Sequence, residues 1–376
     1  MGYQKPGYQE HRRETMMRVG MVVPSLGKRC GISEYSRALA GELENLGGYV
    51  RLIPSCGVEA ATRIIEQELT LAHFQFEYVL YDIGLLAKTV ERLAQAGVSA
   101  VATMHDFTPG LVNYNRFIIQ GFPDIIVHSQ QLARELLMRL TSRDGERVHV
   151  IPMGCPSYKL KDEQDVRAAL GLGPGPAIGF FGFMLPQKGI IELAMAFKEL
   201  RRDFPEMQCF IFSSLAPYTS SKRYLAEVES EFTRLGLWEG VILRKEYLPE
   251  EEVVQLLHAM DINILPYYDR GFIGTSAAVR TLMAARKPVI ATDVPFFSDL
   301  DGEIYKIRDP DPGNIVRAVK LLLGDRTLRD RLVSQAGEYV ERNSWPNIAR
   351  RHLKLYDSIL QKRKVTAGRV MSSNEQ

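Results

Sequence analysis

The chain of 376 residues has few cysteines, no long apolar run and almost no net charge. Its four cysteines, Cys30, Cys56, Cys155 and Cys209, form no CxxC pair, which argues against a zinc site or a disulfide framework and favours reduced thiols. No run of about 18 apolar residues occurs, so no membrane-spanning helix is expected. The 47 Lys and Arg residues nearly balance the 45 Asp and Glu residues, for a net charge of +2, so nucleic acid is not expected as the main partner.

The beginning of the chain lacks the apolar segment of a secretory signal, since Met1 to Thr15 are polar. We therefore expect a cytoplasmic location. Basic residues between Lys5 and Arg18 leave peripheral contact with the inner face of a membrane open. Residues 1–16 and 363–376 are predicted to be tails without fixed structure.

Apolar runs of strand length alternate with segments of helical period along nearly the whole chain. Continuous apolar strands separated by helices are typical of a parallel sheet covered on both faces, so the predicted fold class is α/β. The expected strands are 18–23, 50–53, 72–76, 99–104, 124–128 and 148–151, and then 177–181, 208–212, 241–243, 262–265 and 288–292.

A break in this alternation divides the strands into two sets. The segment from Ser157 to Pro176 is first charged and then rich in Gly and Pro, which predicts a junction between domains. We therefore expect two doubly wound, Rossmann-like domains, at 17–165 and 170–343. In such sheets ligands bind beyond the carboxyl ends of the strands, so functional residues are sought in the loops that follow strands.

Two of these loops lie in the first domain. Pro24 to Gly31 leads into a helix, and Gly31 would let a ligand approach the backbone, but the loop is neither GxGxxG nor a P-loop. His105 and Asp106 end the strand 99–104. This pair can bind a ligand or move a proton, and it can equally be a capping Asp beside a solvated His.

Two further loops lie in the second domain. Lys188, in the loop from Gly182 to Gly189, would stand beside a helix start, which suits a phosphate group. Thr275 and Ser276 precede another helix, where they can simply cap it or frame a second phosphate. Two such helix starts in one domain suggest a diphosphate.

Several segments in a fixed order carry a resemblance to a known family. The chain resembles the GT-B glycosyltransferases of the retaining group called glycosyltransferase family four, from about Arg18 to Gln361. The segments are CGISEYSRALAGEL, HFQFEY, TMHD, VHSQQLAREL, VHVIPMG, GFMLPQKGIIELAMAF, ILPYYDRGFIGTSAAVRTLMAARKPVIATD and SWPNIARRHLKLY. The last is similar to the family's helix that returns to the first domain, which places such a helix at 344–362.

The resemblance implies transfer of a sugar, with retention and without a metal or other cofactor, from a nucleotide-diphosphate donor to a glycan or lipid-linked acceptor. His105 would face the donor sugar as the catalytic residue. The other implied site residues are Lys188, Gly274, Thr275, Ser276 and Gly31 at the diphosphate, Tyr247, Leu248 and Thr281 on the nucleoside side, and Gln75 and Glu77 on the acceptor side.

The sequence departs from the family pattern at four positions. Ile273 and Thr281 replace two glutamates, Phe183 replaces an arginine and Arg286 replaces a glycine. Arg280 would then either supply a replacement charge or be a solvated helix residue. These departures keep a second hypothesis open, a catalytically weak GT-B protein that binds a nucleotide sugar or a partner enzyme. A GT-B epimerase or phosphorylase is a third.

Overall fold

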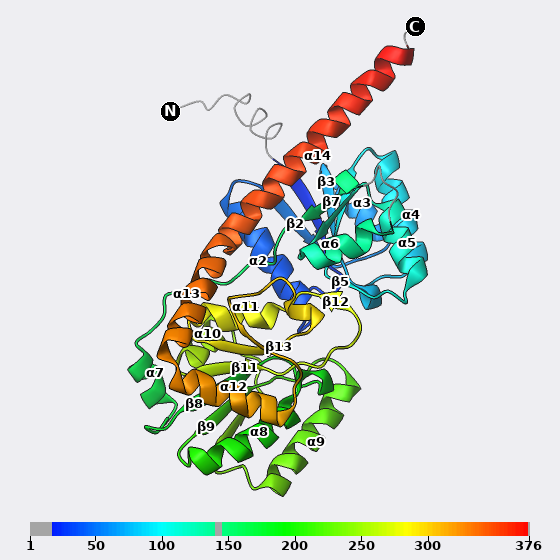
Figure 1. Cartoon of the computed structure of the whole chain (residues 1–376). Helices are drawn as coiled ribbons and strands as arrows, with labels where there is room; N and C mark the ends of the chain where they lie inside the picture. The colour runs from blue at the N-terminus through cyan, green and yellow to red at the C-terminus, as the bar shows by residue number, and fades with distance from the viewer. Residues whose placement is uncertain (1–16, 140–144, 375–376) are drawn as a thin grey trace, which may run out of the picture. The chain divides into compact units, whose positions relative to one another are not determined.

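The computed structural model describes residues 17–139 and 145–374, with side chains as far as residue 363. Two compact units make up the described chain. The first comprises the described residues up to Pro152 together with those from Trp345 onward, and the second is Met153–Ser344. Figure 1 shows each unit as a set of strands flanked by helices.

The first unit contains a six-stranded parallel sheet in the order β2-β1-β3-β4-β6-β7. Every residue of its central strands β3 and β4 is buried, as expected for apolar strands covered on both faces. The strands are β1 (Arg18–Val22), β2 (Tyr49–Ile53), β3 (Leu71–Phe76), β4 (Ser99–Met104), β6 (Asp124–Val127) and β7 (Val148–Val150). The α-helices are α2 (Gly31–Asn45), α3 (Val58–Glu66), α4 (Ile83–Gln95), α5 (Val112–Gly121), α6 (Gln130–Leu137) and α14 (Trp345–Asn374).

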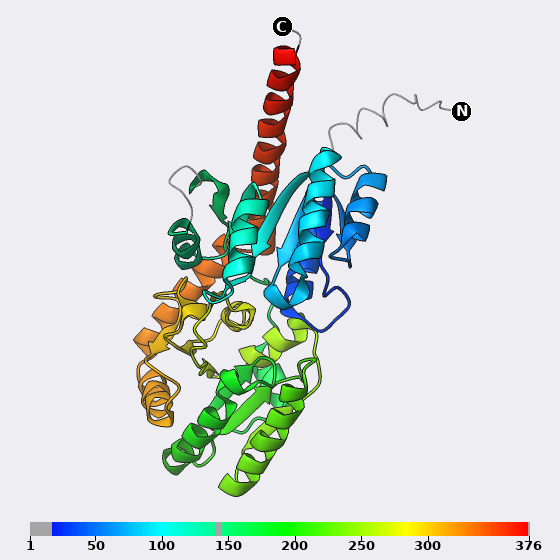
Figure 2. The same cartoon turned by 90° about the vertical axis from the view of Figure 1, so that its right-hand side faces the viewer.

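The second unit repeats the plan, with a six-stranded parallel sheet in the order β10-β9-β8-β11-β13-β14. Its strands are β8 (Ala177–Phe181), β9 (Gln208–Phe212), β10 (Val241–Arg244), β11 (Ile262–Leu265), β13 (Val289–Thr292) and β14 (Tyr305–Ile307). Its α-helices are α7 (Glu163–Ala169), α8 (Ile190–Asp203), α9 (Thr219–Leu235), α10 (Glu250–His258), α11 (Ala277–Ala284), α12 (Pro312–Gly324) and α13 (Arg326–Arg342). Figures 1 and 2 show helices on both faces of each sheet, which confirms the predicted α/β class with two Rossmann-like domains.

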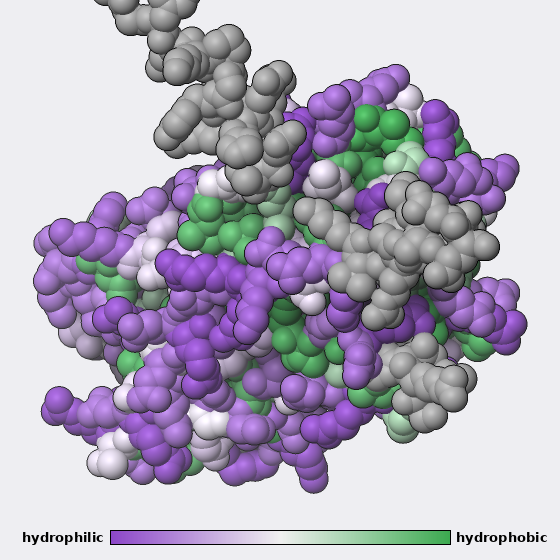
Figure 3. Space-filling model, turned by 90° about the horizontal axis from the view of Figure 1, so that it is seen from above, coloured by the Kyte–Doolittle hydropathy of each residue, from purple (hydrophilic) through white to green (hydrophobic). Residues whose placement is uncertain are grey.

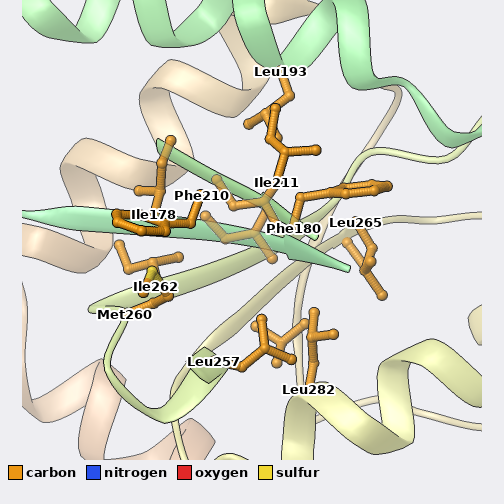
Figure 4. Close-up of a cluster of buried hydrophobic side chains, with 14 of the residues drawn as sticks. Ile178, Phe180, Leu193, Phe210, Ile211, Leu257, Met260, Ile262, Leu265 and Leu282 are labelled. Atoms are coloured by element: carbon orange, nitrogen blue, oxygen red, sulfur yellow. The ribbon is translucent and has the colours of Figure 1, made fainter. Parts of the chain in front are cut away.

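The core of the second unit lies between its sheet and the helices packed on it (Figure 4). Burying a side chain of this size contributes about 1.5–3 kcal/mol. Phe180, Phe210 and Leu265 come from three strands, and Leu193 and Leu282 come from helices on the two faces, all fully buried. Because β8, β9 and β11 are held from both sides, the loops that follow them start from fixed points.

The expected junction between Ser157 and Pro176 lies inside the second unit. Arg167 on α7 donates a hydrogen bond of 2.9 Å to the carbonyl oxygen of Ala259, and Glu163 pairs with Lys287 at 2.7 Å. These bonds dock the segment on the second unit, so the chain changes unit between Pro152 and Met153. The Gly- and Pro-rich stretch is only the turn between α7 and β8.

The ends of the chain differ in what the structure describes. Residues 1–16, predicted to be a tail, lie outside the described residues. The predicted tail at 363–376 was wrong for residues 363–374, because α14 continues to Asn374. This stretch contains no proline, and its one glycine, Gly368, weakens a helix without breaking it. Figures 1 and 2 show the last turns of α14 leaving the sheet of the first unit.

Among the described residues, no helix is both long and apolar enough to cross a bilayer. The face drawn in Figure 3 is mostly hydrophilic, and its hydrophobic residues form separate small groups.

Candidate functional site

In the second unit, the loops after β8 and β11 bring Lys188 and Tyr267 together. The Lys188 Nζ lies 3.7 Å from the centroid of the Tyr267 ring, a cation–π geometry. Two bonds hold this pair of loops: the Tyr268 amide donates to the Gln187 carbonyl at 3.0 Å, and the Thr292 hydroxyl donates to the Tyr267 carbonyl at 2.7 Å. Lys188 therefore has a fixed position at the carboxyl edge of the sheet.

A glycine permits this close approach of the two loops. Gly189, which follows Lys188 and precedes α8, has φ of 68°. A Cβ at this position would lie 1.9 Å from the carbonyl oxygen of Pro266, so no other residue fits without moving the loop.

The side chain of Lys188 carries a positive charge when protonated. Among the described residues, no carboxylate forms an ion pair with it. Its side chain is half-buried, and burial lowers the pKa of its ammonium group to about 7. An anion bound beside it would raise that pKa again. The position therefore suits a bound phosphate group.

The second anion-binding element is the start of α11. Gly274 ends the two-residue strand β12 (Ile273–Gly274), and Thr275 and Ser276 follow it. Ser276 is the N-cap residue, but no side chain caps the helix, so the simple capping interpretation was wrong. The Thr275 hydroxyl is buried and has no hydrogen-bond partner among the described residues. The helix start thus keeps donors that a ligand could use.

Tyr267 was missed by sequence reasoning. Its hydroxyl is buried and faces Ser276 without a hydrogen bond of good geometry. Burial raises the pKa of this hydroxyl above its ordinary value, so it stays protonated and can donate. Only its place directly after a strand, in PYYDRG, could have indicated it.

Arg280, on α11, is buried and paired rather than solvated. It donates to the carbonyl oxygen of Ser276 at 3.0 Å, to the Asp299 carboxylate, and to the Tyr339 hydroxyl at 3.1 Å. Burial alone would lower the pKa of the guanidinium, but Asp299 and Tyr339 raise it above its ordinary value. Because Asp299 balances its charge, Arg280 is not a spare cation for a ligand. It fixes the backbone at Ser276 instead.

The predicted nucleoside-side residues separate into two groups. Thr281 is buried on α11 and donates to Glu250 Oε1 at 3.0 Å, while Tyr158 donates to Glu250 Oε2 at 3.4 Å. Glu250, the first residue of α10, therefore connects Thr281 on α11 to Tyr158 in the segment before α7. Tyr247 is 37% exposed in the loop before α10, and Leu248 packs on the core.

In the first unit, β3 and β4 bring Gln75 and His105 together. Gln75 is fully buried on β3, and His105, directly after β4, is 8% exposed. His105 Nε2 lies 3.0 Å from Gln75 Oε1, and His105 Nδ1 lies 3.3 Å from His128 Nε2. The solvated-His interpretation was therefore wrong. Burial, and next the charge of His128, hold the pKa of His105 well below its ordinary value.

Carboxylates and a glycine lie near the same edge of this sheet. Glu77 accepts a bond of 3.2 Å from the Val79 amide, and burial raises its pKa. Burial, followed by the charge of Glu77, raises the pKa of Asp106 to about 7, and Asp106 Oδ1 is buried without a partner among the described residues. Gly31 is the exposed first residue of α2, and a Cβ there would meet open space.

No group of three or more His, Cys, Asp or Glu side chains within residues 17–139 and 145–374 is arranged to hold a metal ion. The geometry therefore offers two chemistries: anion binding by Lys188 and the start of α11 in the second unit, and hydrogen bonding by a neutral His105 in the first. The ligand-binding and catalytic roles of the predicted site residues stay predictions. These residues are Lys188, Gly274, Thr275, Ser276, Gly31, Tyr247, Leu248, Thr281, His105, Gln75 and Glu77.

Comparison with known proteins gives relatives for part of the chain. Residues 175–325 match the family described as Glycosyl transferases group 1. D-inositol 3-phosphate glycosyltransferase of a Nocardioides species is 26% identical over 248 residues, which are 62% of this chain and 53% of the relative. That of Corynebacterium urealyticum is 26% identical over 200 residues, 52% of this chain and 46% of the relative. The chain thus spans about half the length of the curated relatives it matches.

Solved structures match over more of the chain. A glycosyltransferase from Rickettsia africae has a TM-score of 0.73 at 14% identity, covering 92% of this chain and 99% of its own. Sucrose-phosphate synthase from Thermosynechococcus elongatus has 0.72 at 18%, covering 92% and 100%. HepE from Anabaena, solved with UDP and glucose, has 0.71 at 16%, covering 91% and 100%. The chain has the GT-B fold of these proteins, and its residues 175–325 match the transferase family described as Glycosyl transferases group 1.

Proposed function

We propose that this protein transfers a sugar, with retention, from a nucleotide-diphosphate donor bound by the second unit to a glycan or lipid-linked acceptor bound by the first. The observation that carries the proposal is Lys188, which has no described carboxylate partner, lies over Tyr267 and belongs to the region that matches group 1 glycosyltransferases. The start of α11, with the unpartnered Thr275 hydroxyl, supplies the second element of a diphosphate site.

The proposed chemistry needs no metal and no second catalytic carboxylate. When the bond from the sugar to the diphosphate breaks, negative charge grows on the leaving phosphate. Lys188 and the N–H groups at the start of α11 would stabilise that charge. Attack by an acceptor hydroxyl on the same face as the departing phosphate, which takes up the hydroxyl proton, would retain the configuration, unlike the two-carboxylate route of glycosidases. His105 would contact the donor sugar.

The names of the relatives suggest the first substrates to test. HepE was solved with UDP-glucose, and a trehalose-6-phosphate synthase from E. coli with UDP-2-fluoro glucose. A uridine diphosphate sugar is therefore the first donor to try. The curated relatives are named for D-inositol 3-phosphate, so a phosphorylated polyol joins the glycan and lipid-linked acceptors. The cytoplasmic location of the protein stays a prediction, and so does an encounter with its acceptor at the inner face of a membrane.

The second candidate function is a GT-B protein that binds a nucleotide sugar, or a partner enzyme, with little catalysis. The hydrogen bond from the Thr281 hydroxyl to Glu250 favours this second function, because the hydroxyl then does not donate to a nucleoside. Ile273, buried where the family has a glutamate, favours it as well.

Calorimetric titration with UDP, GDP and ADP, each free and as the sugar conjugate, tests the donor site. We expect one base to bind clearly better than the others. Release of nucleotide from the bound sugar conjugate, without and with acceptors, then separates the candidates. Tight binding without any release would favour the weakly catalytic protein, and no binding of any nucleotide at millimolar concentration would reject a donor site. His105→Ala is expected to lower turnover more than nucleotide binding.

A further inference from the structure

A chain of buried polar side chains crosses the first unit and ends at a backbone carbonyl. His128 follows β6, and its Nδ1 lies 2.9 Å from the carbonyl oxygen of Ile151. Its Nε2 lies 3.3 Å from His105 Nδ1, and His105 Nε2 lies 3.0 Å from Gln75 Oε1. His128, His105 and Gln75 are at most 8% exposed, so water does not replace these partners.

The carbonyl oxygen of Ile151 sets the direction of the hydrogen bonds in this series of side chains. A carbonyl oxygen only accepts, so His128 Nδ1 carries a hydrogen and donates to Ile151. His128 is 1% exposed, and burial favours its neutral form. Its other nitrogen is then an acceptor, and it receives the Nδ1–H of His105. His105 Nε2 is in turn an acceptor. In the structure Gln75 Oε1 faces this nitrogen, so the direction requires the Gln75 amide to be turned over, with its nitrogen toward His105 and its oxygen toward His73. The donors therefore run from Gln75 through His105 and His128 to Ile151.

The opposite end of this series of side chains, at His73, does not impose a direction on the hydrogen bonds. His73 lies beside Gln75, and its ring nitrogens lie 2.7 Å from the Thr103 hydroxyl and 2.6 Å from the Tyr356 hydroxyl. A hydroxyl can donate or accept, so these two partners accommodate either tautomer of His73. The tautomer of His105 is therefore decided at the Ile151 end, through His128.

The C-terminal helix fixes the plane of the His105 ring in the same way. His352 on α14 uses Nδ1 on the Ile348 carbonyl at 2.9 Å, which leaves Nε2 to face the Tyr35 hydroxyl at 3.5 Å. The Tyr35 ring meets His105 edge to face, with 4.9 Å between centroids and 85° between planes. Tyr35 thus holds the face of the imidazole while His128 and Gln75 hold its nitrogens.

We propose that His128 is a positioning residue that fixes His105 as the neutral Nδ1–H tautomer, so that His105 Nε2 meets the substrate as a hydrogen-bond acceptor. This inference rests on the proposed function, in which His105 contacts the donor sugar. A sugar hydroxyl can donate to that nitrogen in place of the Gln75 amide. His105 then supplies no positive charge to the leaving phosphate, and that task falls to Lys188 in the second unit.

The tautomer can be measured without any substrate. Nitrogen-15 NMR of the full chain with labelled histidine, with His105 assigned through His105→Asn, distinguishes the two neutral tautomers and the cation. We expect the wild type to show Nδ1–H at His105. His128→Gln keeps an amide that donates to Ile151 and an oxygen that accepts from His105, so Nδ1–H should persist. His128→Leu removes the acceptor, and His105 should shift toward Nε2–H, which Gln75 can accept.

A matched control separates this effect from a general disturbance. His258 on α10 in the second unit makes the same type of bond, from Nδ1 to the Ala285 carbonyl at 2.8 Å, and His258→Leu should leave the His105 signal unchanged. A wild-type His105 that is Nε2–H or charged would overturn the proposal, as would Nδ1–H retained in a folded His128→Leu. If His128→Leu does not fold, the wild type and His128→Gln still decide the tautomer.

Turnover gives the second measurement. We expect His128→Leu to lower kcat about tenfold or more, as misplacing a reacting contact does, while KM changes less than twofold. His128→Gln should recover most of kcat. Equal kcat in both variants would overturn the positioning role even with the expected tautomers. A wild type with the expected tautomer and no turnover on any donor would reject the proposed function instead, because the NMR result does not depend on it.

Discussion

The two units offer the same edge of the same kind of sheet, but they satisfy their polar groups differently. In the first unit, both ring nitrogens of His105 lie within hydrogen-bonding distance of Gln75 and His128. In the second, Lys188 has no described carboxylate partner and the Thr275 hydroxyl has no described partner at all. His105 is thus already bonded within the protein, although Asp106 Oδ1 beside it has no described partner, whereas Lys188 and Thr275 are left for a ligand.

This difference has an energetic side. A buried polar group without a partner costs about 1–3 kcal/mol, so a folded chain keeps one only where something compensates. A bound diphosphate would recover this cost as binding free energy. At His105 there is less to recover, because both ring nitrogens already have partners, so this side chain is better suited to orientation than to affinity. The four predictions below test this contrast, in order of decreasing effect.

The largest effect is expected where the second unit resembles the first, at the buried network of Arg280, Asp299 and Tyr339. Arg280→Met leaves the Asp299 carboxylate buried beside Tyr339 alone. Breaking a buried ion pair from one side costs about 3–5 kcal/mol, so the free energy of unfolding should fall by that amount. Urea unfolding of the purified variant measures it.

The control is the double variant Arg280→Met with Asp299→Leu. Replacing both partners by apolar side chains is often nearly neutral, so much of the lost stability should return. Nucleotide affinity should stay reduced in both variants, because the bond from Arg280 to the Ser276 carbonyl is missing. Full affinity in the double variant would show that Arg280 does not hold the start of α11 for a ligand.

The next effect concerns the unbalanced cation. Lys188→Ala should weaken nucleotide-diphosphate binding by about 1–3 kcal/mol, the range for losing a charge-assisted hydrogen bond. Lys198→Ala, an exposed lysine on α8, is the matched control and should leave affinity unchanged. Calorimetry measures both. Equal affinity in the two variants would remove Lys188 from the donor site and would end the contrast between the units.

A smaller effect follows from the pKa of Lys188, which burial lowers to about 7. The ammonium form binds a diphosphate, so affinity should be highest below that pKa and fall as the pH rises through it. Between about pH 6 and pH 8 the loss should approach about tenfold, because the protonated fraction of a group with a pKa of about 7 falls by that factor over this range. UDP-glucose is the better probe, because its phosphates do not titrate in this range. Lys188→Arg should bind with a flat pH profile, and a sloping profile in that variant would assign the titration elsewhere.

The fold was predictable because its signal is repeated many times. All six of the apolar runs expected in the first domain overlap strands by most of their length, and the class follows from their alternation with helices. The junction was harder, since Gly and Pro mark a turn as readily as a linker. Whether Ser157 to Pro176 is free or docked depends on partners such as Ala259 that lie far away in the sequence.

Individual side chains of the site were predictable only by position. Lys188, Ser276 and His105 were singled out because each follows a strand or begins a helix. Their partners were not: Tyr267 and His128 lie in segments that resemble the family, but no role was predicted for either side chain. Their contacts depend on neighbours that the sheet brings to them. Arg280 was judged by its residue type, which favours solvent, whereas a distant aspartate keeps it buried.

The smallest predicted effect compares one strained residue in each unit. Arg286, after α11, and Glu68, after α3, are the two described residues other than glycine with positive φ, at 54° and 53°. Left-handed backbone costs a side-chain-bearing residue about 1–2 kcal/mol, and the greater freedom of glycine in the unfolded chain offsets about half of the gain. Arg286→Gly and Glu68→Gly should each stabilise their unit by about 0.5–1 kcal/mol, a rise of a few degrees in Tm by calorimetry. Neither should change nucleotide affinity by more than twofold. A change confined to Arg286→Gly would mean that strain at the end of α11 reaches the ligand groups at its start, and the second unit would then differ from the first in its backbone as well as in its unsatisfied side chains.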